Sequence, residues 1–262
     1  MLRRSFLQLF ASGVLLALLG ARGRAASRSD LYTFQHGVAS GDPLHDAVIL
    51  WTRVSNASGE RLTLNWLVAR DEAMTDIVAS GVARTDADRD YTVKVDARDL
   101  PSDALLYYRF AIGDNVSPVG RTRTLPAGSV DTARFAVVSC SNHPYGFFNA
   151  YRDIAEHDDL DAVIHLGDYI YEYGLGQYAT ERAEALGRIP DPPTELLTLS
   201  DYRRRYAQYR SDPDLKAAHA AHPMIAVWDD HEIANDAWRD GAENHGNGKD
   251  VDEGAWAARR EA

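Results

Sequence analysis

Residues 162–174 read AVIHLGDYIYEYG, and the rest of the chain is organised around this stretch. Its apolar first half predicts a buried β-strand that ends in the carboxylate of Asp168, the position at which open α/β sheets hold their ligands. Gly167 lets the backbone bend close to whatever that carboxylate holds. Tyr171 follows three residues later, so a carboxylate and a phenol lie within reach of one cation. The alternative is an ordinary strand-to-loop turn, since Gly and Asp are common turn residues.

Two further apolar runs also end in potential metal ligands. Residues 134–143 read RFAVVSCSNH and place Cys140 at the end of a predicted strand. Residues 224–236 read MIAVWDDHEIAND, in which Asp230 and His231 follow a third predicted strand. A neutral imidazole beside carboxylates suits metal binding or proton transfer near neutral pH.

The order of these elements predicts where the ligands meet. A helix predicted at residues 147–157 separates the strand at 134–139 from the strand at 161–167, which indicates a parallel pair with a right-handed crossover. Because parallel strands end at one edge of a sheet, we expect Cys140 and Asp168 to lie close together. Cys140 is the only cysteine and cannot form an internal disulfide, so metal ligation explains it best, with a buried inert thiol as the alternative.

The overall composition is that of a globular protein, with 262 residues, 45% hydrophobic and 26% charged. Residues 1–25 differ, because Arg3 and Arg4 precede an apolar run and then small residues, the pattern of an export signal. The hexapeptide RRSFLQ resembles the twin-arginine motif. The apolar run is short for a membrane span, although an anchor or a buried helix is the alternative. We therefore expect export by the twin-arginine machinery, no stable membrane span, and a periplasmic or secreted protein.

The charge balance excludes one class of partner. Removal of residues 1–25 takes away four arginines and no acids, so the formal net charge changes from −11 to −15. Such a surface repels nucleic acid and anionic membranes, so no nucleic-acid binding is expected. An acidic exported protein can, however, concentrate divalent cations.

Residues 31–126 predict an N-terminal β-sandwich of the immunoglobulin or fibronectin type. Short runs in which apolar and polar residues alternate recur about every dozen residues. These runs are residues 47–54, 61–70, 77–84, 91–97, 105–113 and 119–125. Residues 126–129 (PAGS) indicate a domain boundary, after which strands and helices alternate through residues 133–262. The predicted fold class is therefore α+β with two domains.

Two helices are expected after a long insertion at residues 173–200. The first is predicted to begin at Ser200 as its N-cap and to run to about Arg210, and the second to begin at Asp212 and run to about Ala221. The first helix carries four arginines that are able to grip phosphate oxygens, although such a run is more often a solvated face paired with acids. They are Arg203, Arg204, Arg205 and Arg210.

Several long motifs resemble the alkaline phosphatase D (PhoD-like) family of exported phosphodiesterases and phosphomonoesterases, within the calcineurin-like metallophosphoesterase superfamily. They are SCSNHPYGFFNAYRDIAEHDDLDAVIHLGDYIYEYG, WDDHEIAND and, in the first domain, HGVASGDPLHDAVILWTRV. The resemblance implies a leading β-sandwich followed by the first part of an α/β metallophosphoesterase domain. It also implies hydrolysis of a small-molecule phosphoester by a metal-bound hydroxide.

The resemblance further implies which residues hold the metals. Ferric iron is expected to bind a thiolate, a carboxylate and a phenolate, those of Cys140, Asp168 and Tyr171, with Asp168 bridging to a calcium ion. Asp230 is then a ligand of the second metal, and His231 is the proton donor or phosphate-side stabiliser. Asn235 is a weaker candidate for contact with the substrate.

One feature departs from the superfamily, which supplies further ligands downstream in a Gly-His-x-His-like element. After His231 the sequence has only His245. We therefore expect the chain to represent the first half of such an enzyme, monomeric, with little activity alone and with an exposed sheet face that lowers solubility. The alternatives are a non-catalytic exported binding protein with a vestigial metallophosphoesterase domain, or a metallohydrolase acting on another ester.

Overall fold

The longest sheet is mixed and six-stranded, in the order β5-β2-β1-β11-β10-β9. A computed structural model describes residues 32–57, 59–246 and 253–262, so the predicted export signal at residues 1–25 lies outside the described part. The strands of this sheet are β1 (Val38–Gly41), β2 (Val48–Arg53), β5 (Thr92–Ala97), β9 (Phe135–Val138), β10 (Ala162–His165) and β11 (Pro223–Ala226).

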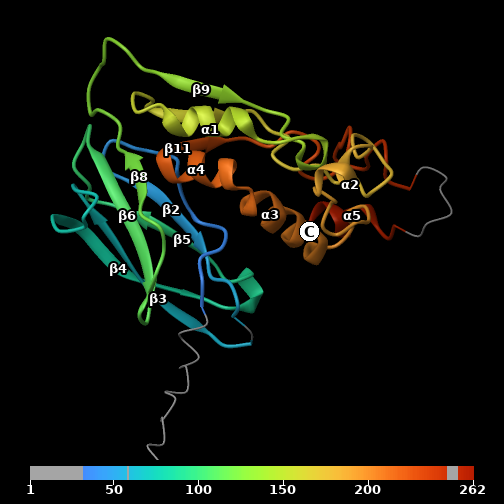
Figure 1. Ribbon diagram of the computed structural model, residues 1–262, viewed down its shortest axis with the longest axis horizontal. Coiled ribbons are helices and arrows are strands. Elements are labelled where there is room, and N and C mark those ends of the chain that lie inside the picture. The colour runs from blue at the N-terminus through green and yellow to red at the C-terminus, as the bar shows by residue number, and fades with distance from the viewer. Residues whose placement is uncertain (1–31, 58, 247–252) are drawn as a thin grey trace, which may run out of the picture.

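A second, antiparallel sheet packs against the N-terminal part of the first (Figure 1). It has the order β4-β3-β6-β7, and β8 also pairs with β6. Its strands are β3 (Leu62–Ala69), β4 (Ile77–Thr85), β6 (Leu105–Ile112), β7 (Asn115–Val116) and β8 (Gly120–Arg123). All six strands predicted before residue 126 are therefore present. Their alternating apolar residues form one core between the sheets, with Leu50, Leu64 and Phe110 fully buried.

The two predicted regions share a sheet, which the sequence did not predict. β1 pairs in parallel with β11, so that Gly41 lies opposite Met224. A Cβ at Gly41 would lie 2.7 Å from the carbonyl oxygen of Met224, and only glycine allows this approach. The pairing joins residues about 180 positions apart, which local patterns do not reveal.

The predicted strand-helix-strand unit is confirmed. β9 and β10 are parallel, and β10 is also parallel to β11. Between β9 and β10 lie the short 3-10 turn η3 (His143–Tyr145) and α1 (Asn149–Glu156). The helices α1, α3 (Leu199–Ser211) and α4 (Pro213–Ala221) cover one face of these strands and form a second core with them. Figure 1 shows α3 and α4 across the middle of the molecule, with α2 (Ala183–Leu186) and α5 (Trp256–Arg260) among the loops on the side away from the second sheet.

The start of α3 corrects one prediction. Its N-cap is Thr198, not Ser200. The Thr198 hydroxyl accepts a hydrogen bond from the amide of Asp201, and the Asp201 carboxylate accepts one from the amide of Thr198 at 2.9 Å. This reciprocal pair needs an acid three residues after the cap, and the residue three positions after Ser200 is Arg203. The predicted cap of α4, Asp212, is confirmed, since it accepts from the amides of Asp214 and Leu215.

On the face opposite the helices, no described residues cover β9 and β11. It presents the side chains of Phe135 (46% exposed), Val137 (60%), Ile225 (36%) and Val227 (55%), which we call the open face. β9 is also the last strand of its sheet, so an edge adjoins this apolar surface. The exposed sheet face expected from the sequence is therefore present.

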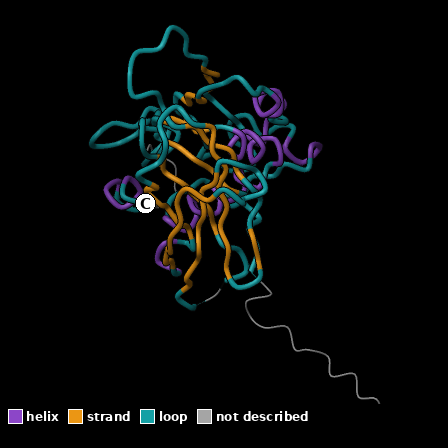
Figure 2. The backbone as a smooth tube through the Cα atoms, turned by 90° about the vertical axis from the view of Figure 1, so that its left-hand side faces the viewer, coloured by secondary structure: helices purple, strands orange, loops and turns teal. Residues whose placement is uncertain are grey.

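Figure 2 shows the strands running side by side below a region made mainly of loops. Among the described helices, none has the length and apolar composition that crossing a membrane requires.

Candidate metal centre

The ends of β9 and β10 bring Cys140 and Asp168 together. Val138 and His165 are paired in the register of these parallel strands, so both chains leave the sheet at the same edge. Beyond the strands, the amide of Cys140 donates to the carbonyl of Gly167 at 3.2 Å, and the amide of Ser141 donates to the carbonyl of Asp168 at 3.0 Å. The predicted proximity of the two segments is confirmed.

Both segments turn sharply at the candidate ligands. Cys140 and Asp168 have positive φ angles of 58° and 52°, a region that residues other than glycine seldom adopt. Gly167 has a φ of 104°, and a Cβ there would lie 2.5 Å from the amide nitrogen of Asp229. Strained conformations of this kind gather where side chains are held for a function. Here they bend the backbone at both candidate ligands, at the same edge of the sheet.

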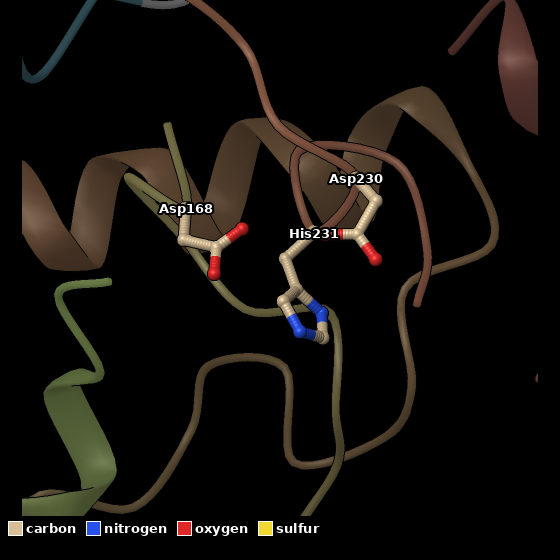
Figure 3. A group of neighbouring side chains, drawn as sticks. All are labelled: Asp168, Asp230 and His231. Atoms are coloured by element: carbon tan, nitrogen blue, oxygen red, sulfur yellow. The ribbon is translucent and has the colours of Figure 1, made fainter. Parts of the chain in front are cut away.

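Three potential ligands from two loops form a cluster. Asp168 follows β10, while Asp230 and His231 follow β11. One ligand atom from each of them lies within 4.8 Å of the others. Figure 3 shows the two carboxylates on either side of the His231 side chain. Asp168 and His231 are buried, being 7% and 8% exposed, so that an ion bound there would be largely shielded from water.

Tyr171 also belongs to this group. Its hydroxyl donates to Oδ2 of Asp168 at 3.0 Å, and its ring lies 4.4 Å from the imidazole of His231 between centroids. Burial, then the Asp168 carboxylate and then the Cys140 thiol raise the pKa of the Tyr171 phenol. Cys140 itself is exposed, and its sulfur is not among the clustered ligand atoms, so the thiol lies beside the cluster and not within it. Oδ1 of Asp168 is buried without a hydrogen-bond partner in the described part of the chain.

Glu172 is a functional candidate that the sequence reasoning did not assign. Its side chain is fully buried, and Oε2 accepts a hydrogen bond from Nδ1 of His231 at 2.8 Å. Oε1 accepts from the amide of Asn235 at 2.7 Å and from Nδ2 of Asn244 at 2.8 Å. No local pattern singled it out, because Ile170, Tyr171 and Glu172 are buried one after another.

The carboxylates around His231 set its protonation. Burial alone would lower its pKa, but the hydrogen bond to Glu172 and the charges of Glu172, Asp168 and Asp230 together raise the pKa of His231 above its ordinary value. With Nδ1 directed at Glu172, Nε2 is the ring nitrogen left for other partners.

Glu232 holds the two loops together. Its carboxylate accepts from the amides of Asp168 at 3.1 Å and Asp229 at 2.8 Å, and also from the amide of Tyr169. Burial raises the pKa of Glu232, although these hydrogen bonds act to lower it. Because the donors lie after both β10 and β11, this side chain fixes the spacing between Asp168 and Asp230.

Asn235 lies at the edge of the group. Its side-chain amide donates to Glu243, and its backbone amide donates to Glu172. Both its side-chain and its backbone amide are therefore engaged with acidic neighbours. Asp230 in turn accepts a hydrogen bond from the amide of Asp236 through Oδ2.

The chemistry of these donors fits metal ions. A thiol and a phenol suit a ferric ion once they are deprotonated, and carboxylate oxygens suit a hard divalent cation. The buried, unpartnered Oδ1 of Asp168 is satisfied if it binds an ion. Fold and site together thus define an α/β protein with a candidate metal centre at the carboxyl ends of parallel strands.

Comparisons with known proteins point to one family of phosphatases. The profile of the PhoD-like phosphatases matches residues 135–262, and that of their N-terminal domain matches residues 20–126. Alkaline phosphatase D of Bacillus subtilis (strain 168) is 44% identical over 220 residues, which are 80% of this chain and 37% of that protein. A solved structure of PhoD has a TM-score of 0.72 and 43% identity, covering 78% of this chain and 40% of that one. The chain belongs to the PhoD-like phosphatase family. It spans less than half the length of these relatives.

Proposed function

We propose that the protein to which this chain belongs is an exported, metal-dependent phosphoesterase, an alkaline phosphatase or phosphodiesterase acting on small phosphoesters. The observation that carries the proposal is the cluster of Asp168, Asp230 and His231, with the Tyr171 hydroxyl bonded to Asp168 and the backbone of Cys140 bonded to that of Gly167. The family relationship and the name of the Bacillus subtilis relative support it.

The resemblance to the family suggests two metal sites, and the donor chemistry allows them. Cys140, Asp168 and Tyr171 would hold Fe³⁺, and Asp168 with Asp230 would hold Ca²⁺. Bound ions of this kind lower the pKa of water and neutralise charge on phosphoryl oxygens. A cation at this point favours the phenolate of Tyr171 and so opposes the pKa increase that burial and Asp168 cause.

The residues of the chain supply orientation and proton transfer. Glu172 keeps the Nδ1 proton of His231, and Nε2 is then the atom that passes a proton to the leaving oxygen of the ester. Glu232 keeps the loops of Asp168 and Asp230 at a fixed distance through their amides. Asn235 contributes to the substrate side of the pocket in this proposal.

The remaining parts of the proposal concern the whole protein. Residues 1–25 act as a twin-arginine signal, residues 31–126 form the β-sandwich domain, and residues 133–262 form the first part of the metallophosphoesterase domain. The protein is then a periplasmic or secreted monomer. Core packing between the two sheets supports the sandwich assignment.

Metal binding by the 262-residue chain tests the centre directly. We expect Fe³⁺ to bind at one ion per chain and to give a visible charge-transfer band, measured by elemental analysis and absorption. Tyr171→Phe and Cys140→Ser should each lower the stoichiometry or shift the band. Tyr178→Phe is the matched control, because its ring stacks near that of Tyr171 but is 60% exposed.

Hydrolysis is then measured with a phosphomonoester, a phosphodiester and a carboxylic ester, in this chain and in a version extended to the length of the relatives. Turnover of either phosphoester that requires the metal and His231 supports the proposal. A folded, colourless chain that binds no iron, with an extended version that cleaves no phosphoester, would instead favour a non-catalytic binding protein.

A further inference from the structure

A second feature lies on the other side of Glu232 from the candidate metal centre. An open cavity of about 740 Å³, which we call the α3 cavity, is lined by β1, β2 and β5, by α3 and by the segment after β11. Tyr169 and Glu232 form the wall towards the metal centre. Cys140, Asp168, Tyr171, Asp230 and His231 do not line it.

The α3 cavity is rich in positive charge, although the chain as a whole carries a formal net charge of −11. Its cationic residues come from four elements and are Arg53, Arg89, Lys94, Arg203 and Arg210, against the acids Asp90 and Glu232 and the terminal carboxylate of Ala262. Asp90 is neutralised by Arg53, which donates from Nε at 2.9 Å and from Nη2 at 2.8 Å. Glu232 accepts from backbone amides. A net positive charge therefore remains in the cavity walls.

Arg210 is the most informative of these residues. It is only 6% exposed, and in the described part of the chain its guanidinium contacts backbone carbonyls and an aromatic ring instead of a carboxylate. Nη2 donates to the carbonyls of His36 at 3.1 Å and Val38 at 3.3 Å, while Nε and Nη1 are buried without hydrogen-bond acceptors. A buried cation with no anionic partner is costly, and an anion placed beside it removes part of that cost.

Aromatic rings form much of the remaining wall. The guanidinium of Arg210 lies over the Trp51 ring, 4.6 Å from its centroid. Tyr202 and Tyr206 line the cavity from α3, and Trp228 lines it from the segment after β11 with 76% of its surface exposed. Rings of this kind stack on planar groups and exclude water around a charge.

We propose that the α3 cavity binds an oxyanion attached to an aromatic or similarly planar group, with Arg210 as its main charge partner. The site is additional to the proposed metal centre and shares only the wall of Tyr169 and Glu232 with it. The neighbouring His36 agrees with a positive environment, since burial, Arg53 and Arg210 lower its pKa to about 4. It is therefore neutral near pH 7 and adds no charge of its own.

The test titrates the full 262-residue chain with phenylphosphonate by calorimetry. This probe has a phosphoryl oxyanion and a ring but no ester bond to hydrolyse. Arg210→Met should weaken binding about tenfold or more, as expected for the loss of a charged hydrogen-bonding partner. Lys94→Met, at an exposed position of the same cavity, should weaken it a few-fold without affecting folding. Arg152→Met is the matched control, because Arg152 is exposed, pairs with Asp214 and does not line the cavity.

Two further sets of titrations test which ligand groups are recognised and whether the probe binds in the α3 cavity or at the metal centre. Inorganic phosphate should bind at least tenfold more weakly than phenylphosphonate, and comparison with benzoate shows whether phosphoryl or carboxylate oxygens are preferred. Binding of the probe should be unchanged in Asp168→Asn. Binding lost in Asp168→Asn but kept in Lys94→Met and Arg210→Met, equal binding of inorganic phosphate, or no binding at all would overturn the proposal. Failure of iron binding would leave this result unaffected.

Discussion

Glu172 is the residue on which the orientation of His231 depends. Its fully buried carboxylate accepts hydrogen bonds from the His231 ring and from two other donors, and its charge helps to raise the pKa of His231. Sequence reasoning identified His231 because an imidazole among acids suggests chemistry. It passed over Glu172 because an acid beside tyrosines in a loop has no strong local pattern. Glu172 and His231 are 59 positions apart in the sequence, so only the fold reveals that they are in contact.

Replacing Glu172 by Gln should test this contact. One oxygen becomes an NH₂ group, so either His231 Nδ1 must accept a hydrogen bond instead of donating one, or the amides of Asn235 and Asn244, which share Oε1, both lose their acceptor. We expect the free energy of unfolding to fall by about 1–3 kcal/mol, as for a buried donor left unsatisfied. Urea unfolding of the metal-free chain measures the change, and ring ¹⁵N shifts report the His231 tautomer.

Glu184→Gln is the control for that measurement. Glu184 is exposed on α2, and its replacement should change stability by no more than about 0.5 kcal/mol. Equal stability of both variants, together with an unchanged His231 tautomer, would contradict the assigned role of Glu172.

His143 predicts how stability depends on pH. Burial, followed by the charge of Arg188, lowers its pKa to about 4, while Asp212 acts in the opposite direction and Arg205 in the same one. The folded protein therefore keeps His143 neutral where the unfolded chain, with a histidine pKa near 6.5, binds a proton. Its contribution is complete above about pH 6.5 and is lost as the pH falls towards 4, by at most about 1.4 kcal/mol per pH unit.

His143→Gln should reduce the slope of unfolding free energy against pH between pH 6.5 and 4. The side chain of His45 is 59% exposed, so His45→Gln should leave the slope unchanged. Denaturant unfolding at several pH values in this range measures both. A slope that is the same in His143→Gln and in the unsubstituted chain would show that His143 is protonated in the fold.

At the scale of elements, local patterns predicted most of the secondary structure. Period-two runs located the strands of the second sheet, and the order of strand, helix and strand placed Cys140 beside Asp168. The prediction for the start of α3 was wrong by two residues, since Thr198 and Ser200 are both suitable caps by residue type and only the reciprocal bond with Asp201 distinguishes Thr198. The sequence also gave no sign that Arg205 would be buried and bonded to backbone carbonyls of the insertion.

The turn after β10 depends on a single residue, Gly167. Gly167→Ala combines a φ of 104° with a Cβ only 2.5 Å from the backbone amide of Asp229, so the loops of Asp168 and Asp230 must move apart. We expect a loss of about 3 kcal/mol in stability and weaker iron binding. Gly128→Ala, where a Cβ has open space, should change neither. Wild-type iron affinity in Gly167→Ala would show that the close approach is not required.

At the scale of the whole molecule, the shared sheet changes the relation between the two predicted regions. β1 inserts between β2 and β11, so the N-terminal strands extend the sheet that carries the candidate metal centre. Composition and periodicity identify strands but not distant partners, which depend on the register and on the space at Gly41. The α3 cavity arises at this junction and for the same reason was not predicted as a site, although its arginines were noted.

The open face predicts how the isolated chain behaves in solution. Val137 lies on the edge strand β9 next to other exposed apolar side chains, which favours association between chains. Val137→Lys places a charge on this edge and should raise the dissociation constant for self-association about tenfold or more, a change of about 1.4 kcal/mol. Sedimentation and light scattering over a range of concentrations measure it.

Val82→Lys is a closely matched control for Val137→Lys. Val82 is also 60% exposed and also lies on an edge strand, β4, but its neighbours on that face are Ser80 and Arg84 and its cross-strand partner is Asn65. Both variants change the net charge equally, so general electrostatic repulsion affects them alike. If association depends on the open face, only Val137→Lys relieves it. An equal effect of both substitutions would mean that net charge, and not this apolar surface, controls the association of the chain.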